Sequence, residues 1–425
     1  MNILYVGSLA IPLRDVLSGK TENEITGWPA FFFPVYKLIM EGHQVDFVVV
    51  SDMKDYNISV DWFNENQIVE NIYIDNSKRG KYGLLSKLYY RIFEDIKFLK
   101  AINKAVKKKH YDFIYCQEIT GAWGNVIANK YNIPCGVRIY GDAFAFRGKI
   151  HTKYEFIQKH GVLSLFLALP KMMLLYKLKK SFMLTTADGT HGDLTYEILK
   201  PKKKKYDFYY WKTGVNKNLP LKDFDIETAL NDVQYITYPA RIDTIKRQEV
   251  AIDVLNLIHK KGYNIHLYLI GQVCNDEYYN ALLNIIEKYD LSEYIHFTGG
   301  VTQNQVKIFA LNSIASILTG EVSNRGNVFF ELFSIGVPIV AFDDGSLNDY
   351  IDNDESGYLV NDIEEMSNCV IRLINDPQLR EYISQNALRT ANEKVLSESM
   401  RFDMEIELIK KYAGYQIDKD FPNRL

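Results

Sequence analysis

Cysteine is scarce in this chain: its 425 residues include four cysteines, and no two of them form a C-x-x-C pair. No histidine accompanies them at the spacing of metal ligands. This distribution argues against a disulfide framework and against a structural zinc site, and it favours free thiols. The first residues also lack the basic start and the small-residue cleavage site of a signal peptide, so we expect residues 2–8 to form a strand.

No apolar stretch is long enough to span a bilayer. The longest, residues 161–176, contains Pro170 and Lys171 and falls short of the roughly 18 residues that a spanning helix needs. We therefore predict a cytoplasmic protein. Lysines gather around this stretch at 149–180, at 104–109 and at 202–205. This pattern favours peripheral docking on an anionic membrane surface, at the inner face of the cell membrane. A buried helix with a solvated lysine face is the alternative.

Charge of one sign is not in excess, because 50 Lys and Arg oppose 53 Asp and Glu for a net charge of −3. The balance differs along the chain: residues 1–205 hold 30 basic and 20 acidic residues, and the remainder holds 20 and 33. Halves of opposite sign predict two domains with different partners. A nucleic-acid partner is not expected, since there is no recognition motif and no module of interleaved basic and aromatic residues.

The rest of the sequence alternates runs of strand length with longer helical patterns. Runs rich in Val, Ile, Phe and Tyr predict strands at 2–8, 44–50, 112–116, 135–140, 181–186, 233–240, 265–271, 294–300, 314–320 and 337–342. Helices are expected at 28–41, 83–109, 121–131, 152–180, 247–260, 276–289, 303–312, 327–335 and 363–374, with two more at 378–413. Repetition of this kind produces parallel sheets with helical crossovers.

The charged segment 200–225 has little helical periodicity and contains Gly214 and Pro220, so we place a domain boundary there. We predict two Rossmann-like α/β domains, at 1–205 and 206–395, and a final helix at 396–425 that crosses back to the first domain. Open parallel sheets bind ligands beyond the carboxyl ends of their strands. A central cleft between two facing sheets is therefore the expected active site.

Two nucleotide-binding signatures are missing. No G-x-G-x-x-G follows the first strand and no Walker lysine motif occurs, which argues against hydride transfer and against a P-loop enzyme. After the strand at 314–320, a polar loop leads to Gly326 and Asn327 at a helix start, with Glu331 one turn further on. Free amides beside a glycine can bind an anion, and the glutamate can accept hydrogen bonds from a vicinal diol. An ordinary βαβ unit with an exposed glutamate is the alternative.

A pair of cations follows the strand at 233–240. Arg241 and Lys246 are separated by four residues in YPARIDTIKRQE (238–249). In a loop after a strand both side chains can point into a cleft, where two fixed positive charges suit a diphosphate leaving group. The alternative is that they are solvated loop charges.

Together these residues resemble the retaining glycosyltransferases of family 4, within glycosyl transferases group 1. The resemblance runs along the whole chain through ITGWPAFF (25–32), EGHQVDFVVV (41–50), TGVN (213–216), the Arg241 and Lys246 pair, LIGQ (269–272), HFTGGV (296–301), GNVFFELFSIGVPIVA (326–341) and SGYLV (356–360). It implies the GT-B fold, in which two Rossmann-like parallel-sheet domains face a central cleft.

The resemblance also implies a division of the site. A nucleotide-diphosphate sugar would bind the C-terminal domain, with Glu331 on the ribose and with Arg241 and Lys246 on the diphosphate. The implied donor-binding residues are Gly27, Arg241, Lys246, Gly271, Glu321, Ser323, Gly326, Asn327, Val328 and Glu331. The acceptor would bind the N-terminal domain near Gly27, Tyr140 and Asp142. The candidate catalytic residues are Tyr140, Asp142, Arg241 and Lys246. No metal and no cofactor are implied, because cations and amides of the protein would meet the leaving-group charge.

Two positions depart from the family pattern. Ser323 stands where the pattern has a glutamate, and Glu321, two residues earlier, is the candidate to replace it. Tyr140 stands where the pattern often has a histidine. A tyrosine can donate a hydrogen bond to a sugar hydroxyl but cannot act as an imidazolium. The alternative role of Tyr140 is to pack at a domain edge.

The expected function is hexosyl transfer with retention of configuration to a glycan or lipid-linked glycan, in the synthesis of bacterial surface polysaccharides or glycoconjugates. One alternative is a nucleotide-sugar 2-epimerase, although we find no set of carboxylates and a histidine at cleft positions. The other is a non-catalytic nucleotide-sugar-binding partner protein, which the departures at Ser323 and Tyr140 suggest.

Overall fold

Two compact units make up the chain in the computed structural model, which describes residues 1–9, 17–19, 33–51, 68–73, 84–140, 171–187, 192–220, 233–320 and 325–417. Unit 1 comprises Met1–Lys212 together with Ser399–Leu425, and unit 2 comprises Thr213–Glu398. The C-terminal residues therefore belong to the same unit as the N-terminal half of the chain.

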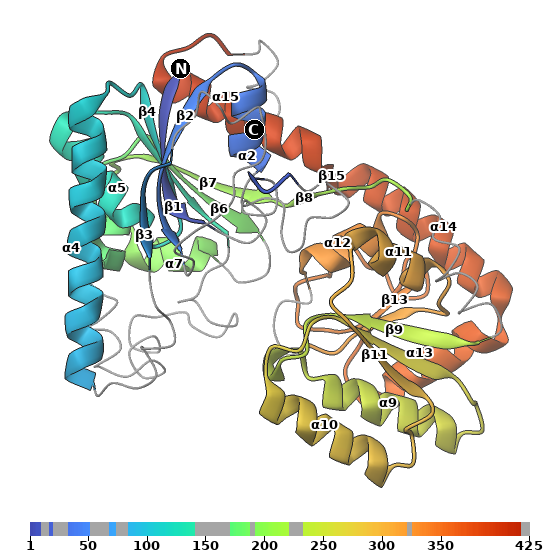
Figure 1. Cartoon of the computed structure of the whole chain (residues 1–425). Coiled ribbons are helices and arrows are strands. Elements are labelled where there is room, and N and C mark those ends of the chain that lie inside the picture. Colours follow the sequence, from blue (N-terminus) through green and yellow to red (C-terminus); the bar gives the residue numbers. More distant parts are fainter. Residues whose placement is uncertain are drawn as a thin grey trace. The chain divides into compact units, whose positions relative to one another are not determined.

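A parallel seven-stranded sheet forms the centre of unit 1, in the order β3-β2-β1-β4-β5-β6-β7 (Figure 1). Its strands are β1 (Asn2–Ser8), β2 (Gln44–Ser51), β3 (Ile68–Tyr73), β4 (Phe113–Gln117), β5 (Cys135–Ile139), β6 (Phe182–Ala187) and β7 (Asp207–Lys212). Every residue of β4, β5 and β6 is buried. Because both faces of these strands are covered, their sequences are largely apolar and do not alternate, with polar residues such as Gln117 and Arg138 buried among them.

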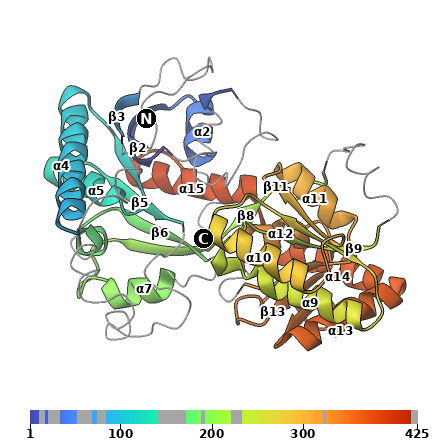
Figure 2. The ribbon, with the colours of Figure 1, turned by 60° about the horizontal axis from the view of Figure 1, so that its bottom comes forward.

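Helices cover both faces of this sheet. Among the described residues of unit 1, the labelled helices are α2 (Phe33–Met40), α4 (Leu84–Lys108), α5 (Gly121–Tyr131), α7 (Gly192–Leu199) and α15 (Glu398–Ala413). Figure 2 shows α4 and α5 on one face and α2 and α15 on the other. Phe98 and Ile102 of α4 join the apolar core that contains Val6, while Phe402 of α15 stacks on Phe33 of α2 with ring centroids 5.1 Å apart. The C-terminal helix is thus an integral layer of unit 1.

Unit 2 is built on a parallel six-stranded sheet in the order β11-β10-β9-β12-β13-β14. Its strands are β9 (Tyr235–Pro239), β10 (His266–Ile270), β11 (Ile295–Gly299), β12 (Ser316–Leu318), β13 (Ile339–Phe342) and β14 (Tyr358–Val360). A short parallel pair, β8 (Gly214–Val215) and β15 (Leu396–Ser397), joins the two ends of the unit. The strand order is that of a doubly wound sheet.

The helices of unit 2 also form two layers. In Figure 1, α9 (Gln248–Lys260), α10 (Asp276–Lys288) and α13 (Ile363–Asn375) lie on one face of the sheet, and α11 (Gln303–Leu311) and α12 (Asn327–Phe333) lie on the other. The helix α14 (Pro377–Lys394) follows α13, and the single-turn η5 (Thr244–Lys246) precedes α9. One large apolar core unites the sheet with both layers.

The structure confirms the predicted α/β class with two parallel sheets. Within residues 200–225 the structure has two strands, β7 and β8, that are not among the strands predicted from the sequence. As the edge strand of its sheet, β7 is mostly half-buried and has a polar and aromatic sequence instead of an apolar one. Its pairing with β6 along its length makes it a strand, and this partner is remote in sequence. The chain leaves unit 1 after Lys212, inside the segment 200–225 in which we placed the boundary and later than residue 205, where the first predicted domain ends.

Candidate functional site

The candidate site of unit 2 lies beyond two neighbouring strands, β9 and β12, which pair at the centre of the sheet. The chain leaves β9 toward β10 on one side and leaves β12 toward β13 on the other. Ligands of doubly wound sheets bind at such a switch point, outside the carboxyl ends of the strands. Arg241 and Lys246 follow β9, and Gly326 and Glu331 follow β12. The fold thus places both predicted groups at one edge, on adjacent strands.

Close backbone packing against β10 fixes the position of Arg241. The N–H of Ala240 donates to the carbonyl of Ile270 at 2.9 Å, and Nε2 of Gln248 donates to the carbonyl of Arg241 at 2.8 Å. A Cβ on Gly271 would lie 2.3 Å from the Ala240 carbonyl oxygen, so any side chain there would force the two strands apart. Gly271 therefore acts on the backbone that carries Arg241.

Side-chain hydrogen bonds tie the loop after β12 to the loop after β9. Thr319, the residue that follows β12, donates its hydroxyl to the carbonyl of Arg247 at 2.9 Å. The hydroxyl of Tyr238 donates to the carbonyl of Lys246. Arg247 itself has a left-handed backbone with φ of 57°, a conformation that persists only where surrounding contacts hold it. These hydrogen bonds therefore fix the loop that carries Arg241 and Lys246.

Arg241 and Lys246 lie near each other. Arg241 is exposed, and its Nε is 3.6 Å from a carboxylate oxygen of Asp243. Within the described residues, the ammonium of Lys246 makes no hydrogen bond. Burial lowers the pKa of Lys246, and repulsion from Arg241 lowers it further. An anion bound between the two side chains would relieve that repulsion.

Glu331 is a buried carboxylate at the centre of α12. It is 7% exposed, and among the described residues its oxygens accept no hydrogen bond. Burial raises the pKa of Glu331 to about 7, although the Lys307 ammonium acts in the opposite direction. Lys307 is itself buried and donates to the carbonyls of Asn216 and Asn218 at 2.8 and 2.7 Å. Hydroxyl donors of a ligand would supply the hydrogen bonds that Glu331 lacks.

The first turn of α12 is open. Gly326 caps the helix without any side-chain hydrogen bond, and a Cβ at Gly326 would meet no atom within 4 Å. The side chain of Asn327 accepts a hydrogen bond from the Thr213 hydroxyl at 3.1 Å. This bond anchors α12 to the residue that opens unit 2. The helix therefore starts at a glycine with open space beside it, and no side chain of the described residues caps it.

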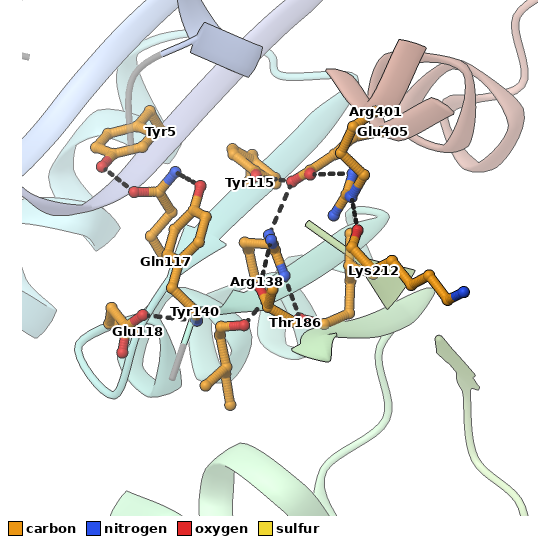
Figure 3. A network of polar contacts seen from close by, with 12 residues as sticks. Tyr5, Tyr115, Gln117, Glu118, Arg138, Tyr140, Thr186, Lys212, Arg401 and Glu405 are labelled. Carbon is orange, nitrogen blue, oxygen red and sulfur yellow. Dashed lines mark hydrogen bonds and ion pairs between the residues drawn. The ribbon is translucent and has the colours of Figure 1, made fainter. Parts of the chain in front are cut away.

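Tyr140, the candidate of unit 1, follows β5 and lies in a polar network that Figure 3 shows. Tyr140 is 1% exposed. Its hydroxyl accepts a hydrogen bond from Nε2 of Gln117 at 3.0 Å, and Oε1 of Gln117 accepts one from the Tyr5 hydroxyl at 2.6 Å. Its N–H donates to Glu118 at 2.9 Å. A ligand role for the Tyr140 hydroxyl stays a prediction; the structure shows it engaged by Gln117.

Behind Tyr140, two buried arginines share one carboxylate (Figure 3). Glu405 of α15 lies 3.4 Å from Nε of Arg138 and accepts a hydrogen bond from Nη1 of Arg401 at 3.0 Å. The guanidinium of Arg138 lies 4.2 Å from the centroid of the Tyr140 ring. Arg401 also donates from Nε to the carbonyl of Lys212 at 3.1 Å. The C-terminal helix thereby helps to fix the end of β5.

Four predicted residues, Gly27, Asp142, Glu321 and Ser323, lie outside the described residues, as does most of the apolar stretch 161–176. Their roles stay predictions. Over the parts of the chain that are described, no group of three or more His, Cys, Asp or Glu side chains is placed to hold a metal ion. The helices in those parts are too short or too polar for any of them to cross a bilayer.

The sequence reasoning missed three residues that shape the site. Lys307 faces Glu331, Thr319 ties the two loops, and Glu405 fixes the arginines behind Tyr140. The sequence could have indicated that Lys307 is buried, because this lysine stands one turn before the buried Ala310 on the core-facing side of α11. The local sequence gives no such indication for Thr319 and Glu405, since their partners are remote in the sequence.

Comparisons with known proteins agree with this geometry. Residues 222–390 match the sequence profile of the family described as glycosyl transferases group 1. The capsular polysaccharide biosynthesis glycosyltransferase CapM of Staphylococcus aureus is 27% identical over 184 residues, which are 41% of this chain and 46% of that protein. The alpha-D-kanosaminyltransferase of Streptomyces kanamyceticus is 24% identical over 161 residues, 37% of this chain and 41% of that one. The chain thus spans about half the length of these curated relatives.

Solved structures extend the likeness to the fold of the whole chain. A sucrose-phosphate synthase of Thermosynechococcus elongatus has a TM-score of 0.70 at 15% identity, with 97% of this chain and 100% of that chain covered. HepE of Anabaena, in complex with UDP, has a TM-score of 0.65 at 15% identity over 97% of this chain and 100% of that chain. The predicted GT-B fold and the resemblance to group 1 glycosyltransferases are confirmed. The narrower assignment to family 4 stays a prediction.

Proposed function

From a GT-B fold whose C-terminal half is similar to the group 1 glycosyltransferases, we propose that this chain is a glycosyltransferase. It transfers a hexosyl group from a nucleotide-diphosphate sugar to a glycan or lipid-linked glycan, with retention of configuration. Arg241 and Lys246 hold the diphosphate and stabilise its negative charge as the sugar leaves. Glu331 binds the ribose hydroxyls, and the amides of 326–328 add hydrogen bonds to the donor.

One observation carries this proposal. A pair of neighbouring cations and a buried carboxylate without hydrogen bonds stand beyond adjacent strands at one switch point. A nucleoside diphosphate has the complementary groups, since its diphosphate is an anion and its ribose diol is a pair of hydrogen-bond donors. The same cations make a bound metal unnecessary for charge neutralisation in this proposal. The departing diphosphate then accepts the proton of the acceptor hydroxyl.

The names of similar proteins support the substrate class. HepE of Anabaena, a neighbour in fold, is described in complexes with UDP and with UDP-glucose. CapM, a relative in sequence, is described as acting in capsular polysaccharide biosynthesis. We therefore place the proposed reaction in the synthesis of bacterial surface polysaccharides or glycoconjugates, and the acceptor in unit 1 near Tyr140.

Peripheral membrane association from the cytoplasmic side is part of the proposal. On α4, Ile92, Phe93 and Ile96 are exposed by 51%, 46% and 45%, and the exposed positions that follow include Lys97 and Lys100. At an anionic bilayer surface, such apolar side chains would enter the interface, and the lysines that follow them along the helix would attract the anionic head groups. Flotation with phosphatidylglycerol vesicles tests this: the wild type should float at low salt, and an Ile92→Ser/Ile96→Ser variant should not. Equal flotation of both would contradict it.

The activity is tested by incubating the full chain with UDP-, GDP- and ADP-sugars and measuring the release of nucleoside diphosphate. Arg241→Ala and Lys246→Ala should each cost about 2–4 kcal/mol in transition-state stabilisation, a fall of about 30- to 1000-fold in kcat/KM. The matched control is Lys260→Ala/Lys288→Ala, which removes two exposed lysines elsewhere in unit 2. Near-full turnover in the Arg241→Ala/Lys246→Ala double variant would overturn the proposal.

The same incubation separates the two alternatives. Formation of an epimer without release of nucleoside diphosphate would indicate a nucleotide-sugar 2-epimerase. Saturable binding of a nucleotide sugar without turnover, measured as a thermal shift, would indicate a non-catalytic binding protein. Release of nucleoside diphosphate that increases when a glycan acceptor is added supports transfer.

A further inference from the structure

A pocket rich in lysine lies in unit 1, at the edge of its sheet opposite to Tyr140. Its volume is about 760 Å³, and its walls include Lys179, Lys180, Lys204, Lys205, Tyr206 and Tyr412. We call it the lysine pocket. All of its wall residues belong to unit 1, and none is among the residues that the proposed glycosyl transfer uses.

The topology explains why these lysines meet. A single residue separates Lys179 and Lys180 from β6, and a single residue separates Lys204 and Lys205 from β7. The two strands are parallel neighbours, with Phe182 opposite Asp207. Parallel neighbours start at the same sheet edge, so the two lysine-rich turns lie side by side. Tyr140 follows the carboxyl end of β5 and so marks the other edge. The lysine pocket is therefore separate from the candidate acceptor region.

The positive charge of the pocket lysines exceeds the negative charge of the residues in the pocket walls. Its walls contain four lysines and a single acidic residue, Asp207. That aspartate is already occupied: Lys204 lies 2.6 Å from one of its oxygens, and the Tyr412 hydroxyl donates to the other. Both contacts lower the pKa of Asp207. Asp207 therefore neutralises Lys204, and the charges of Lys179, Lys180 and Lys205 have no counter-charge in the pocket walls.

Lys179, Lys180 and Lys205 each have N–H donors that no acceptor of the described residues uses. Lys205 donates to the carbonyl of Lys177 at 3.1 Å, and Lys180 donates to the carbonyl of Leu178 at 2.7 Å. An ammonium has three N–H donors, so each has donors left. Lys179 is exposed, and within the described residues its ammonium has no partner. Three ammonium groups with unused donors around one hollow are suited to a polyanion with several acceptor oxygens.

Lys180 is the buried lysine of the lysine pocket. It is 6% exposed, and its Nζ lies 3.6 Å from the centroid of the Tyr206 ring. Burial lowers the pKa of Lys180 to about 7, with repulsion from Lys205 in the same direction and the buried thiols of Cys116 and Cys135 opposing. Keeping a buried ammonium beside other lysines is costly unless an anion accompanies it. Without a bound anion this environment favours the neutral amine of Lys180 near and above neutral pH, and an anion bound beside it would favour the ammonium form.

We propose that the lysine pocket binds the oligophosphate group of a ligand, with Lys179, Lys180 and Lys205 as its donors. An oligophosphate combines a compact charge of two or more with oxygens that face several directions, which single carboxylates do not offer. The group belongs either to a soluble phosphate compound or to a phosphate-bearing lipid head group. This site is additional to the donor diphosphate site, and it does not depend on the proposed transfer reaction.

Calorimetric titration of the full chain with inorganic tripolyphosphate tests the proposal. A Lys179→Glu/Lys205→Glu variant should bind at least about tenfold more weakly than the wild type, about 1.4 kcal/mol. The control Lys260→Glu/Lys288→Glu has the same charge change on exposed lysines of unit 2 and should bind like the wild type. Because Arg241 and Lys246 would also attract tripolyphosphate, the titration is repeated with Arg241→Ala/Lys246→Ala. The pocket site must persist in that variant.

Binding to lipid vesicles shows whether the phosphate group belongs to a soluble compound or to a lipid head group. Flotation uses vesicles of equal parts phosphatidylglycerol and phosphatidylcholine, compared with pure phosphatidylcholine. Loss of tripolyphosphate binding in Lys179→Glu/Lys205→Glu with unchanged flotation indicates a soluble ligand. Loss of flotation in that variant, with α4 intact, indicates a lipid head group. If the pocket variant matches the control in both arms, or if all tripolyphosphate binding disappears with Arg241 and Lys246, the proposal is wrong. Circular dichroism of each variant verifies that it is folded.

Discussion

Replacing Glu331 by glutamine changes how the stability of unit 2 depends on pH. Burial raises the pKa of Glu331 from 4.5 to about 7 in the folded chain. The folded state therefore binds this proton more tightly than the unfolded state does. The resulting stabilisation is complete below about pH 4.5, is lost as the pH rises toward about 7, and is constant above that. Glutamine has no such proton, so a Glu331→Gln variant escapes the loss.

The size of the effect follows from the two pKa values. At about 1.4 kcal/mol per pH unit, the interval from 4.5 to about 7 corresponds to about 3 kcal/mol. Relative to the wild type, Glu331→Gln should thus gain about 3 kcal/mol in free energy of unfolding between about pH 4.5 and pH 7, and no more above. The attraction between Lys307 and the carboxylate already limits this interval, because it holds the pKa of Glu331 lower than burial alone would.

Denaturant unfolding at a series of pH values measures the difference. All four tryptophans, Trp28, Trp62, Trp123 and Trp211, belong to unit 1. Far-ultraviolet circular dichroism reports on both units and tryptophan emission on unit 1 alone, so the transition of unit 2 is the part of the circular dichroism change that tryptophan emission does not follow. Curves of stability against pH that run parallel for wild type and Glu331→Gln would refute the reasoning, because they would mean that Glu331 titrates alike in both states.

The pH dependence of nucleotide binding is a second test of the protonation of Glu331. If ribose hydroxyls donate to Glu331, they stabilise its ionised form and lower its pKa. Binding of a nucleoside diphosphate to the wild type should then strengthen as the pH rises toward about 7 and level off above it, whereas Glu331→Gln should lack this component. Identical pH profiles in calorimetry would remove Glu331 from the ribose site and leave the stability prediction intact.

Three further predictions concern the support of the site. Gly271→Ala should cost about 1–3 kcal/mol in stability and weaken donor binding, because a Cβ there meets the Ala240 carbonyl at 2.3 Å; an unchanged KM and melting temperature would contradict this. Glu405→Gln should cost about 3–5 kcal/mol, since it leaves Arg138 and Arg401 buried without their shared carboxylate; denaturant unfolding followed by tryptophan emission checks it. Tyr140→Phe should lose about 1–3 kcal/mol by leaving the Gln117 amide without an acceptor. A fall in kcat/KM with full stability would instead mean that the hydroxyl contacts the acceptor.

Much of the fold follows from local pattern. The central strands of both sheets are mostly apolar runs, as at β4 and β10. The helix starts have recognisable caps, such as Asn275 before α10 and Asp362 before α13. The strand β7 escaped prediction because its residues gain a strand environment only through β6. Likewise, the turn residues 200–205 have the composition of a solvated linker, and only the neighbouring turn before β6 makes them a pocket wall.

The sequence by itself determined the alternation of strands and helices, and with it the α/β class and the placement of Arg241, Lys246 and Glu331 after strands. These are local properties, since hydrophobic period and turn residues act over a few positions. Only the tertiary structure decided that Glu331 is buried without a hydrogen bond, that Glu405 holds two arginines behind Tyr140, and that two lysine-rich turns share one pocket. Burial and charge pairing depend on partners far along the chain, which strand order alone brings together.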